Sequence, residues 1–261
     1  MRISEVFLYD EPSVPEIEID NLAKFLNEKT GFQVKVRKDF FDFFNIDKKI
    51  AYELASTRIF KQYAPFEKHQ PKLEEVEFEE SFTNRSLTNN IILYDGFELQ
   101  NVLQKIMPDS ELMSDKFHLV FTTRLTCTYD YNDHKYHGRT IVCSNPSIIS
   151  TTGIIEAPAK PREYYLSIYE NMMQGLNLDS IKNQFRGKFL EYHDKNLAKV
   201  VRGYALQAIF YYLTSRPFCE SKNCMLYNAH WQEDLLHSQI EIANLCENHQ
   251  KILDEIQQKS E

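Results

Sequence analysis

Short segments rich in β-branched and aromatic residues alternate with longer segments of helical periodicity along the first part of the chain. The short segments have the pattern of strands, and apolar residues spaced by three and four positions predict helices. Strands are expected at 3–9, 32–36, 91–94, 117–123 and 140–143, a strand or extended loop at 148–155, and helices at 17–31, 46–63 and 97–107.

The last hundred residues have a different pattern, which predicts mainly helices. We expect them over 161–174, 178–192, 195–214 and 230–258. The whole pattern predicts an α+β fold (α/β-like). A mixed β-sheet with packed helices would occupy residues 1–160, and a mainly helical part with a zinc-binding loop would occupy 161–261. Pro158 and Pro161 mark a soft boundary, so the two parts could also form one continuous domain.

Two segments of unusual composition have simple structural interpretations. The aromatic run at residues 40–44 is expected in the hydrophobic core, with the wall of an apolar ligand site as the alternative. Residues 65–89 are expected to form an exposed loop with one short strand. The charges of this segment predict a solvated surface; its acidic cluster is Glu74, Glu75, Glu77, Glu79 and Glu80.

Composition excludes several functional classes. The chain has 261 residues and a formal net charge of −8, which disfavours nucleic acid as a partner. No apolar run approaches the ~20 residues that span a bilayer, so no membrane association is expected. The start lacks the pattern of a signal peptide, which predicts a cytoplasmic protein. With only 7 glycines, the chain has no glycine-rich phosphate loop.

The five cysteines are expected as thiols or metal ligands in a reducing compartment. Cys219 and Cys224 are separated by four residues after a long apolar helix that Pro217 interrupts. Cys246 and His249 are three residues apart, so on a helix they share one face. Three thiols and one imidazole are a common ligand set for a structural Zn²⁺.

This pattern therefore predicts one structural zinc ion. Small buried cysteines and a surface histidine are the alternative, since free cysteine is often buried as an apolar residue. His230 and His237 are rival ligands that could replace His249. A second metal site at His134 and His137 is an alternative to a solvated histidine-bearing loop.

The cysteine pattern resembles that of the archaemetzincins, which are metzincin-type zinc proteases. In that family a cysteine follows the HExxHxxGxxH helix, a second cysteine comes four residues later beside a methionine, and a Cys-x-x-Cys pair completes a second zinc site. Cys219, Cys224 and Met225 match the first half, and Cys246 and His249 match the second with histidine in the last place. A weaker similarity lies at residues 57–63, and residues 119–142 match the edge-strand region. The resemblance implies the fold and a structural zinc in an archaeal protein.

The chain departs from this family at the catalytic motif. No HExxH is present, and Ala208, Tyr212 and Phe218 stand where the family has its three zinc-binding histidines. Ile209 stands for the glutamate and Ser215 for the glycine. A catalytic zinc needs about three protein ligands and an open position for water. No catalytic residue and no cofactor other than zinc is therefore assigned.

The leading functional hypothesis is a catalytically degenerate, archaemetzincin-like zinc-binding protein with a binding or regulatory role toward an unknown protein or peptide. One alternative is an active metal-dependent hydrolase with a rebuilt active site, for which His193, Tyr212, His134 and His137 are the candidate groups. The other alternative is a structural zinc module of a larger assembly.

Overall fold

The computed structural model describes residues 3–81 and 91–258. Its centre is a five-stranded mixed sheet in the order β2-β1-β4-β8-β7, in which only the edge strand β7 runs antiparallel to its neighbour. A smaller sheet, β3-β5-β6, lies beside it. The strands are β1 (Glu5–Tyr9), β2 (Gln33–Arg37), β3 (Leu93–Asp95), β4 (Lys116–Thr122), β5 (Leu125–Asp130), β6 (Lys135–Arg139), β7 (Ile141–Val142) and β8 (Ser147–Ser150).

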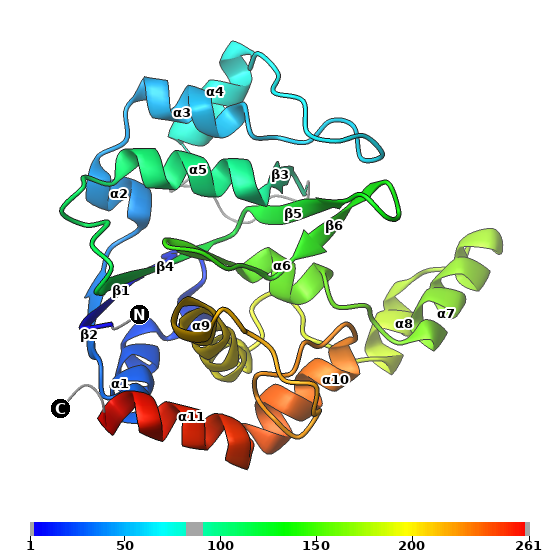
Figure 1. Ribbon diagram of the computed structural model, residues 1–261. Coiled ribbons are helices and arrows are strands. Elements are labelled where there is room, and N and C mark those ends of the chain that lie inside the picture. The colour runs from blue at the N-terminus through cyan, green and yellow to red at the C-terminus, as the bar shows by residue number, and fades with distance from the viewer. Residues whose placement is uncertain (1–2, 82–90, 259–261) are drawn as a thin grey trace.

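Helices cover both faces of the large sheet, as Figure 1 shows. The helices α2, α3, α4 and α5 lie on one side, and α1, α9, α10 and α11 lie on the other. The helical segments are η1 (Pro15–Ile17), α1 (Ile19–Thr30), α2 (Phe40–Phe44), α3 (Lys48–Ala55), α4 (Leu73–Glu80), α5 (Gly96–Ile106), α6 (Thr151–Glu156), α7 (Arg162–Met173), α8 (Asp179–Gln184), α9 (Leu197–Thr214), α10 (Gln232–Leu236), the π-helical η3 (His237–Ile242) and α11 (Glu247–Gln258).

The alternation of side chains along the strands builds two cores, because successive residues of a strand face opposite sides of the sheet. In β1, Val6 and Leu8 pack in the core formed with α1, α9 and α11, whereas Phe7 and Tyr9 pack in the core beneath α2 and α5. The expected α+β fold is confirmed. The first core contains residues from both sides of position 160, and the division into two domains stays a prediction.

Several expected elements differ from the structure. The helix at 46–63 ends at Ala55, and the helix at 178–192 covers only α8. Residues 148–155 begin as β8 and continue as α6, because the Ser150 side chain accepts a hydrogen bond from the backbone N–H of Gly153 and caps the new helix. The expected helix at 230–258 is interrupted at Ala243, whose φ is 48°. Between the strands expected at 117–123 and 140–143, where no element was predicted, the chain forms a hairpin of β5 and β6.

The expected exposed loop at 65–89 is wrong where α4 forms, and residues 82–89 of that prediction lie outside the described residues. Glu79 of the acidic cluster is buried, at 1% exposure. Its carboxylate accepts hydrogen bonds from Arg58 (2.6 Å), Arg124 (2.8 Å) and the Tyr94 hydroxyl (2.8 Å). Two guanidinium groups and a phenol therefore replace the water that the charge pattern predicted.

The aromatic run at 40–44 is in the core as expected, since Phe40 and Phe41 are buried and the other rings pack against them. His118 lies in β4 with no exposed surface, and its ring stacks on those of Phe7 and Tyr9. One ring nitrogen is 3.1 Å from the Tyr9 hydroxyl, and the other is 2.8 Å from the Glu111 carbonyl oxygen. Burial lowers the pKa of His118 from 6.5 to about 4.

This burial predicts a pH dependence of stability. Below pH 6.5 the unfolded chain binds a proton at His118, while the folded chain stays neutral there until about pH 4. Stability is therefore lost as the pH falls through that window. We expect His118→Gln to flatten the decline of the melting temperature between these pH values. Parallel melting profiles for the two proteins would show that His118 does not contribute.

No helix in the described residues is long and apolar enough to cross a membrane. Helix α7 has no buried residue, and it projects from the rest of the molecule together with α8 (Figure 1). One side of α7 contacts the small cluster that α8 anchors. Its other side presents a stripe of exposed apolar side chains, which are Tyr165, Leu166, Tyr169, Met172 and Met173.

Candidate metal centre

The site begins where the central helix α9 ends. Ser215 adopts a left-handed conformation with φ of 59°, and its N–H donates to the carbonyl oxygen of Tyr211. This geometry ends the helix. The chain then continues as irregular backbone through Pro217, as the sequence predicted, and carries Cys219 and Cys224. Cys246 and His249 lie at the start of α11, which follows later in the chain.

Backbone hydrogen bonds close the loop between the first two cysteines. The N–H of Cys219 donates to the carbonyl oxygen of Leu226 (2.8 Å), and the N–H of Tyr227 donates to that of Cys224 (2.9 Å). The N–H of Met225 donates to the Asn244 carbonyl oxygen (2.9 Å), which ties this loop to the segment before α11. The two halves of the motif are thereby held together by the backbone.

Two buried glutamines, one in α9 and one in η3, donate hydrogen bonds to backbone carbonyls of the loop. The Gln207 amide in α9 donates to the carbonyl oxygen of Tyr227 (3.1 Å), and the Gln239 amide in η3 donates to that of Met225 (2.6 Å). Gly203 makes room for Gln239, because a Cβ there would lie 1.7 Å from the Gln239 amide oxygen. These two contacts were not predicted from the sequence, although a lone glutamine within the apolar run of α9 is a signal of such a contact.

The four predicted ligands converge. Their donor atoms, three sulfurs and one imidazole nitrogen, all lie within 4.8 Å of one another. The Cys219 and Cys246 sulfurs are 4.0 Å apart, and His249 Nδ1 lies 3.9 Å from the Cys224 sulfur and 3.1 Å from that of Cys246. Donors around a tetrahedral zinc are about 3.6–3.8 Å apart, given bond lengths of about 2.3 Å to sulfur and 2.1 Å to nitrogen. The spacing and the donor set both fit a zinc ion.

The electrostatic environment also suits a metal. Burial raises the pKa of Cys224 to about 12, so a cation is needed to hold this thiol as a thiolate. Partial burial also acts to raise the pKa of Cys246, but the backbone N–H groups of His249 and Asn248 and the neighbouring thiols lower it overall. Burial lowers the pKa of His249, which favours the neutral imidazole that binds metals.

The rival histidines lie outside this cluster. His237 has both ring nitrogens engaged, with Glu241 at 2.7 Å and Asn223 at 3.0 Å. His230 lies 3.4 Å from the side-chain nitrogen of Asn228. The geometry therefore favours His249 among the three histidines as the fourth donor.

Substituting these histidines tests that assignment. We expect His249→Ala to weaken zinc binding by ~100-fold or more, because a donor to the ion is lost, and His249→Cys to retain it. The matched control His237→Ala should bind zinc like the parent protein. Zinc affinity can be measured by competition with a chromogenic chelator. Equal affinities for His249→Ala and the parent would exclude His249 as a ligand.

A second group of donors lies at the tip of the β5–β6 hairpin. Asp130, Asp133 and His137 have ligand atoms within 4.8 Å of one another, and His137 Nε2 is 2.9 Å from an Asp133 oxygen. His134, the other half of the predicted His-x-x-His pair, is not part of this group. Asp133 is exposed and also pairs with Lys135 at 3.5 Å. An ion pair on a solvated hairpin accounts for this arrangement.

The groups considered for a rebuilt active site have separate partners. His193 lies 3.0 Å from a Glu16 oxygen, and the Tyr212 hydroxyl donates to the Ser114 carbonyl oxygen at 2.8 Å. Within the part of the chain that the structure describes, no hydrogen bond joins any two of His134, His137, His193 and Tyr212. They do not form a set of nucleophile, base and orienting group.

Together, the fold and the site define an α+β protein with a Cys3His cluster that could hold a metal ion. The chain matches, over residues 2–256, a family model described as "Probable metallopeptidase family (DUF6775)". The match covers nearly the whole chain, and the protein belongs to this family.

Among solved structures, the chain is similar to a zinc-dependent peptidase from Methanocorpusculum labreanum (strain Z). The two share 10% sequence identity over 95% of this chain and 98% of that one, with a TM-score of 0.43. The comparison with curated proteins found no match.

Proposed function

We propose that this member of the metallopeptidase family is archaemetzincin-like and catalytically degenerate, that it holds one structural zinc ion, and that it binds a polypeptide instead of cleaving it. Cys219, Cys224, Cys246 and His249 would hold the ion. They occupy all four positions of a tetrahedron, which leaves none for the water that a catalytic zinc activates. When bound, zinc supplies a crosslink between the loop after α9 and the start of α11.

The proposal that the protein has lost catalytic activity depends on one observation, the residues at the positions of the catalytic zinc ligands. The resemblance to archaemetzincins places the three catalytic ligands at Ala208, Tyr212 and Phe218. Ala208 is fully buried in α9, and the Tyr212 hydroxyl donates to a backbone carbonyl. Neither a methyl group nor a phenyl ring donates electrons to zinc, so these positions cannot form a three-ligand site. Ser215, at the position of the family's glycine, has the left-handed conformation that glycine favours, which supports the alignment.

The nature of the partner is inferred from the surface and the family. The exposed apolar stripe on α7 supports a polypeptide partner, because exposed apolar patches on folded proteins mark contact surfaces. None of the five cysteines, all of which the structure describes, forms a disulfide, which supports a reducing compartment such as the cytoplasm.

Hydrolysis of an unfolded protein tests this proposal against the rebuilt active site. We expect zinc-loaded protein to release no peptides from casein above the rate of a sample inactivated with chelator, because no described group activates water. The Tyr212→Phe variant should give the same result as the parent. Activity that a chelator abolishes and added zinc restores would contradict the degenerate assignment and favour the active hydrolase.

A further inference from the structure

The apolar stripe on α7 lies on the outer side of a helical pair that projects from the rest of the molecule (Figure 1). The inner side of α7 is packed, since the Tyr164 ring meets those of Phe185 and Phe189 edge to face, with centroids 5.5 and 5.0 Å apart. The five side chains of the stripe are instead between 49% and 71% exposed; they are Tyr165, Leu166, Tyr169, Met172 and Met173. Exposed apolar side chains that gather on one face mark a contact surface.

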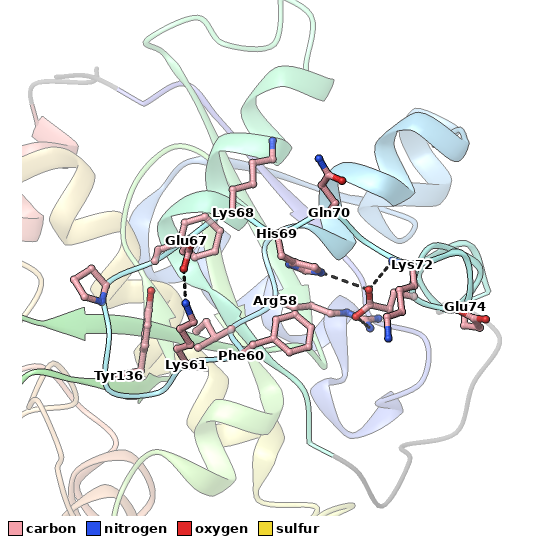
Figure 2. A pocket seen from close by; sticks show the side chains of 14 residues that line it. Arg58, Phe60, Lys61, Glu67, Lys68, His69, Gln70, Lys72, Glu74 and Tyr136 are labelled. Carbon is pink, nitrogen blue, oxygen red and sulfur yellow. Dashed lines mark hydrogen bonds and ion pairs between the residues drawn. The ribbon is translucent and has the colours of Figure 1, made fainter.

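Charge distinguishes this stripe from another place where an aromatic side chain is exposed. The cavity of about 670 Å³ between α3, α4 and β6 contains Phe60, which is 67% exposed. Charged side chains of both signs line that cavity, and Figure 2 shows Lys61 pointing toward Glu67, 2.6 Å away. The stripe on α7 consists only of uncharged side chains, so an apolar surface can cover these side chains without removing one of their charges from water.

The spacing of the stripe is symmetric about Tyr169. Tyr165 and Leu166 come four and three residues before it, and Met172 and Met173 come three and four residues after it. A two-fold axis at Tyr169 would place each half of the stripe against the other half in an antiparallel second copy, as an isologous interface requires. In this register Tyr165 faces Met173 of the second copy, and Leu166 faces Met172. Contacts between a methionine sulfur and an aromatic ring are favourable.

The exposed area is sufficient for a reversible dimer. A large apolar side chain presents on the order of 200 Å² when it is fully exposed, so the stripe exposes roughly 600 Å² per copy. Covering the stripe in two copies removes about 1,200 Å² from water, which is at the lower end of the range for specific protein interfaces. Because α7 projects, pairing through it limits the repulsion between two chains that each have a formal net charge of −8.

We propose that the stripe on α7 pairs with the same stripe of a second copy of this chain, in an antiparallel two-fold dimer with Tyr169 at the axis. This inference rests on the polypeptide-binding role proposed above, because it names the polypeptide that covers the stripe. It requires neither the zinc ion nor the loss of peptidase activity.

Sedimentation equilibrium of the full-length zinc-loaded protein tests the proposal. We expect a monomer–dimer equilibrium with a dissociation constant of about 1–100 µM. Tyr169→Glu should weaken the dimer by about 30-fold or more, since it places two carboxylates at the axis. Phe60→Glu is the matched control, because Phe60 is an aromatic side chain of similar exposure in the cavity, and this variant should dimerise like the parent. Circular dichroism of both variants verifies that they are folded.

A charge exchange tests the register. Leu166→Lys and Met172→Glu should each weaken the homodimer, because the new charge faces an apolar side chain. A mixture of the two variants should recover dimerisation, because the introduced ammonium and carboxylate groups face each other in the mixed dimer.

Three results would overturn the proposal. They are a parent that stays monomeric throughout this concentration range, even if its stripe captures another polypeptide, a dimer that Tyr169→Glu does not weaken, and a mixture of the two charged variants that stays monomeric. Release of peptides from casein would instead contradict the proposed function and leave the dimer intact, so the two failures are distinguishable.

Discussion

Replacing Cys224 by serine is expected to remove the zinc ion and destabilise the protein by about 4 kcal/mol or more, since bound structural zinc contributes directly to the free energy of folding. Cys224 is fully buried, and the loop around it is tied to α9, η3 and the start of α11. We expect the melting temperature to fall by ~10 °C or more. The parent treated with chelator should melt near the temperature of the variant.

Cys143→Ser is the matched control for this experiment. Cys143 is also a free, partly buried thiol, but it lies outside the cluster. The Cys143→Ser variant should keep its zinc ion, and its melting temperature should still fall when chelator is added. If Cys224→Ser melted at the parent's temperature and still responded to chelator, the cluster would not be a structural metal site.

The second large loss of stability is expected from substitution of Glu79, which lies on the opposite side of the large sheet from the Cys3His cluster. Glu79→Gln keeps the size of the side chain but removes the buried carboxylate that pairs with both Arg58 and Arg124, while Arg58 retains its longer contact with Glu75 at 3.7 Å. Breaking a buried ion pair in this way costs ~3–5 kcal/mol. Chemical denaturation of the parent and the variant at pH 7 measures this loss.

Glu80→Gln is the control, since the neighbouring Glu80 is exposed and its substitution should change stability by less than ~0.5 kcal/mol.

The loss of stability in Glu79→Gln should also depend on pH. Burial acts to raise its pKa, but Arg124 and Arg58 lower it overall below the usual 4.5. The contribution of this carboxylate is therefore complete above pH 4.5 and is lost as the pH falls below that value. Equal stabilities of the two variants at pH 7 would contradict the account of this ion cluster.

The sequence predicted the parts of the structure that depend on local pattern. Strands β1, β2 and β4 and helices α7 and α9 lie where apolar periodicity placed them. The Cys and His spacing identified the four side chains that converge after folding. The strands and helices follow from periodicity, and the three-residue spacing places Cys246 and His249 on one face of a helix. The joining of this pair to Cys219 and Cys224, more than 20 residues earlier, was expected from the ligand chemistry of zinc and from the family resemblance.

Features that depend on distant contacts could not be read from the sequence. The burial of Glu79 requires Arg58 and Arg124, which are 21 and 45 residues away, so the acidic run around it had the pattern of a solvated surface. The break before α11 occurs where the chain turns to bring Cys246 to Cys224. The bracing role of Gln239 depends on Gly203, a contact between η3 and α9 that helical periodicity does not indicate.

Elemental analysis of the purified protein, expressed with zinc and dialysed, tests the central claim most directly. A single structural ion in the Cys3His cluster predicts one zinc per chain in the parent and none in Cys224→Ser. Two zinc ions per chain would indicate a further metal site and would support the alternative of an active metal-dependent hydrolase. A parent protein without zinc, or a Cys224→Ser variant that retains it, would contradict the assignment of the cluster.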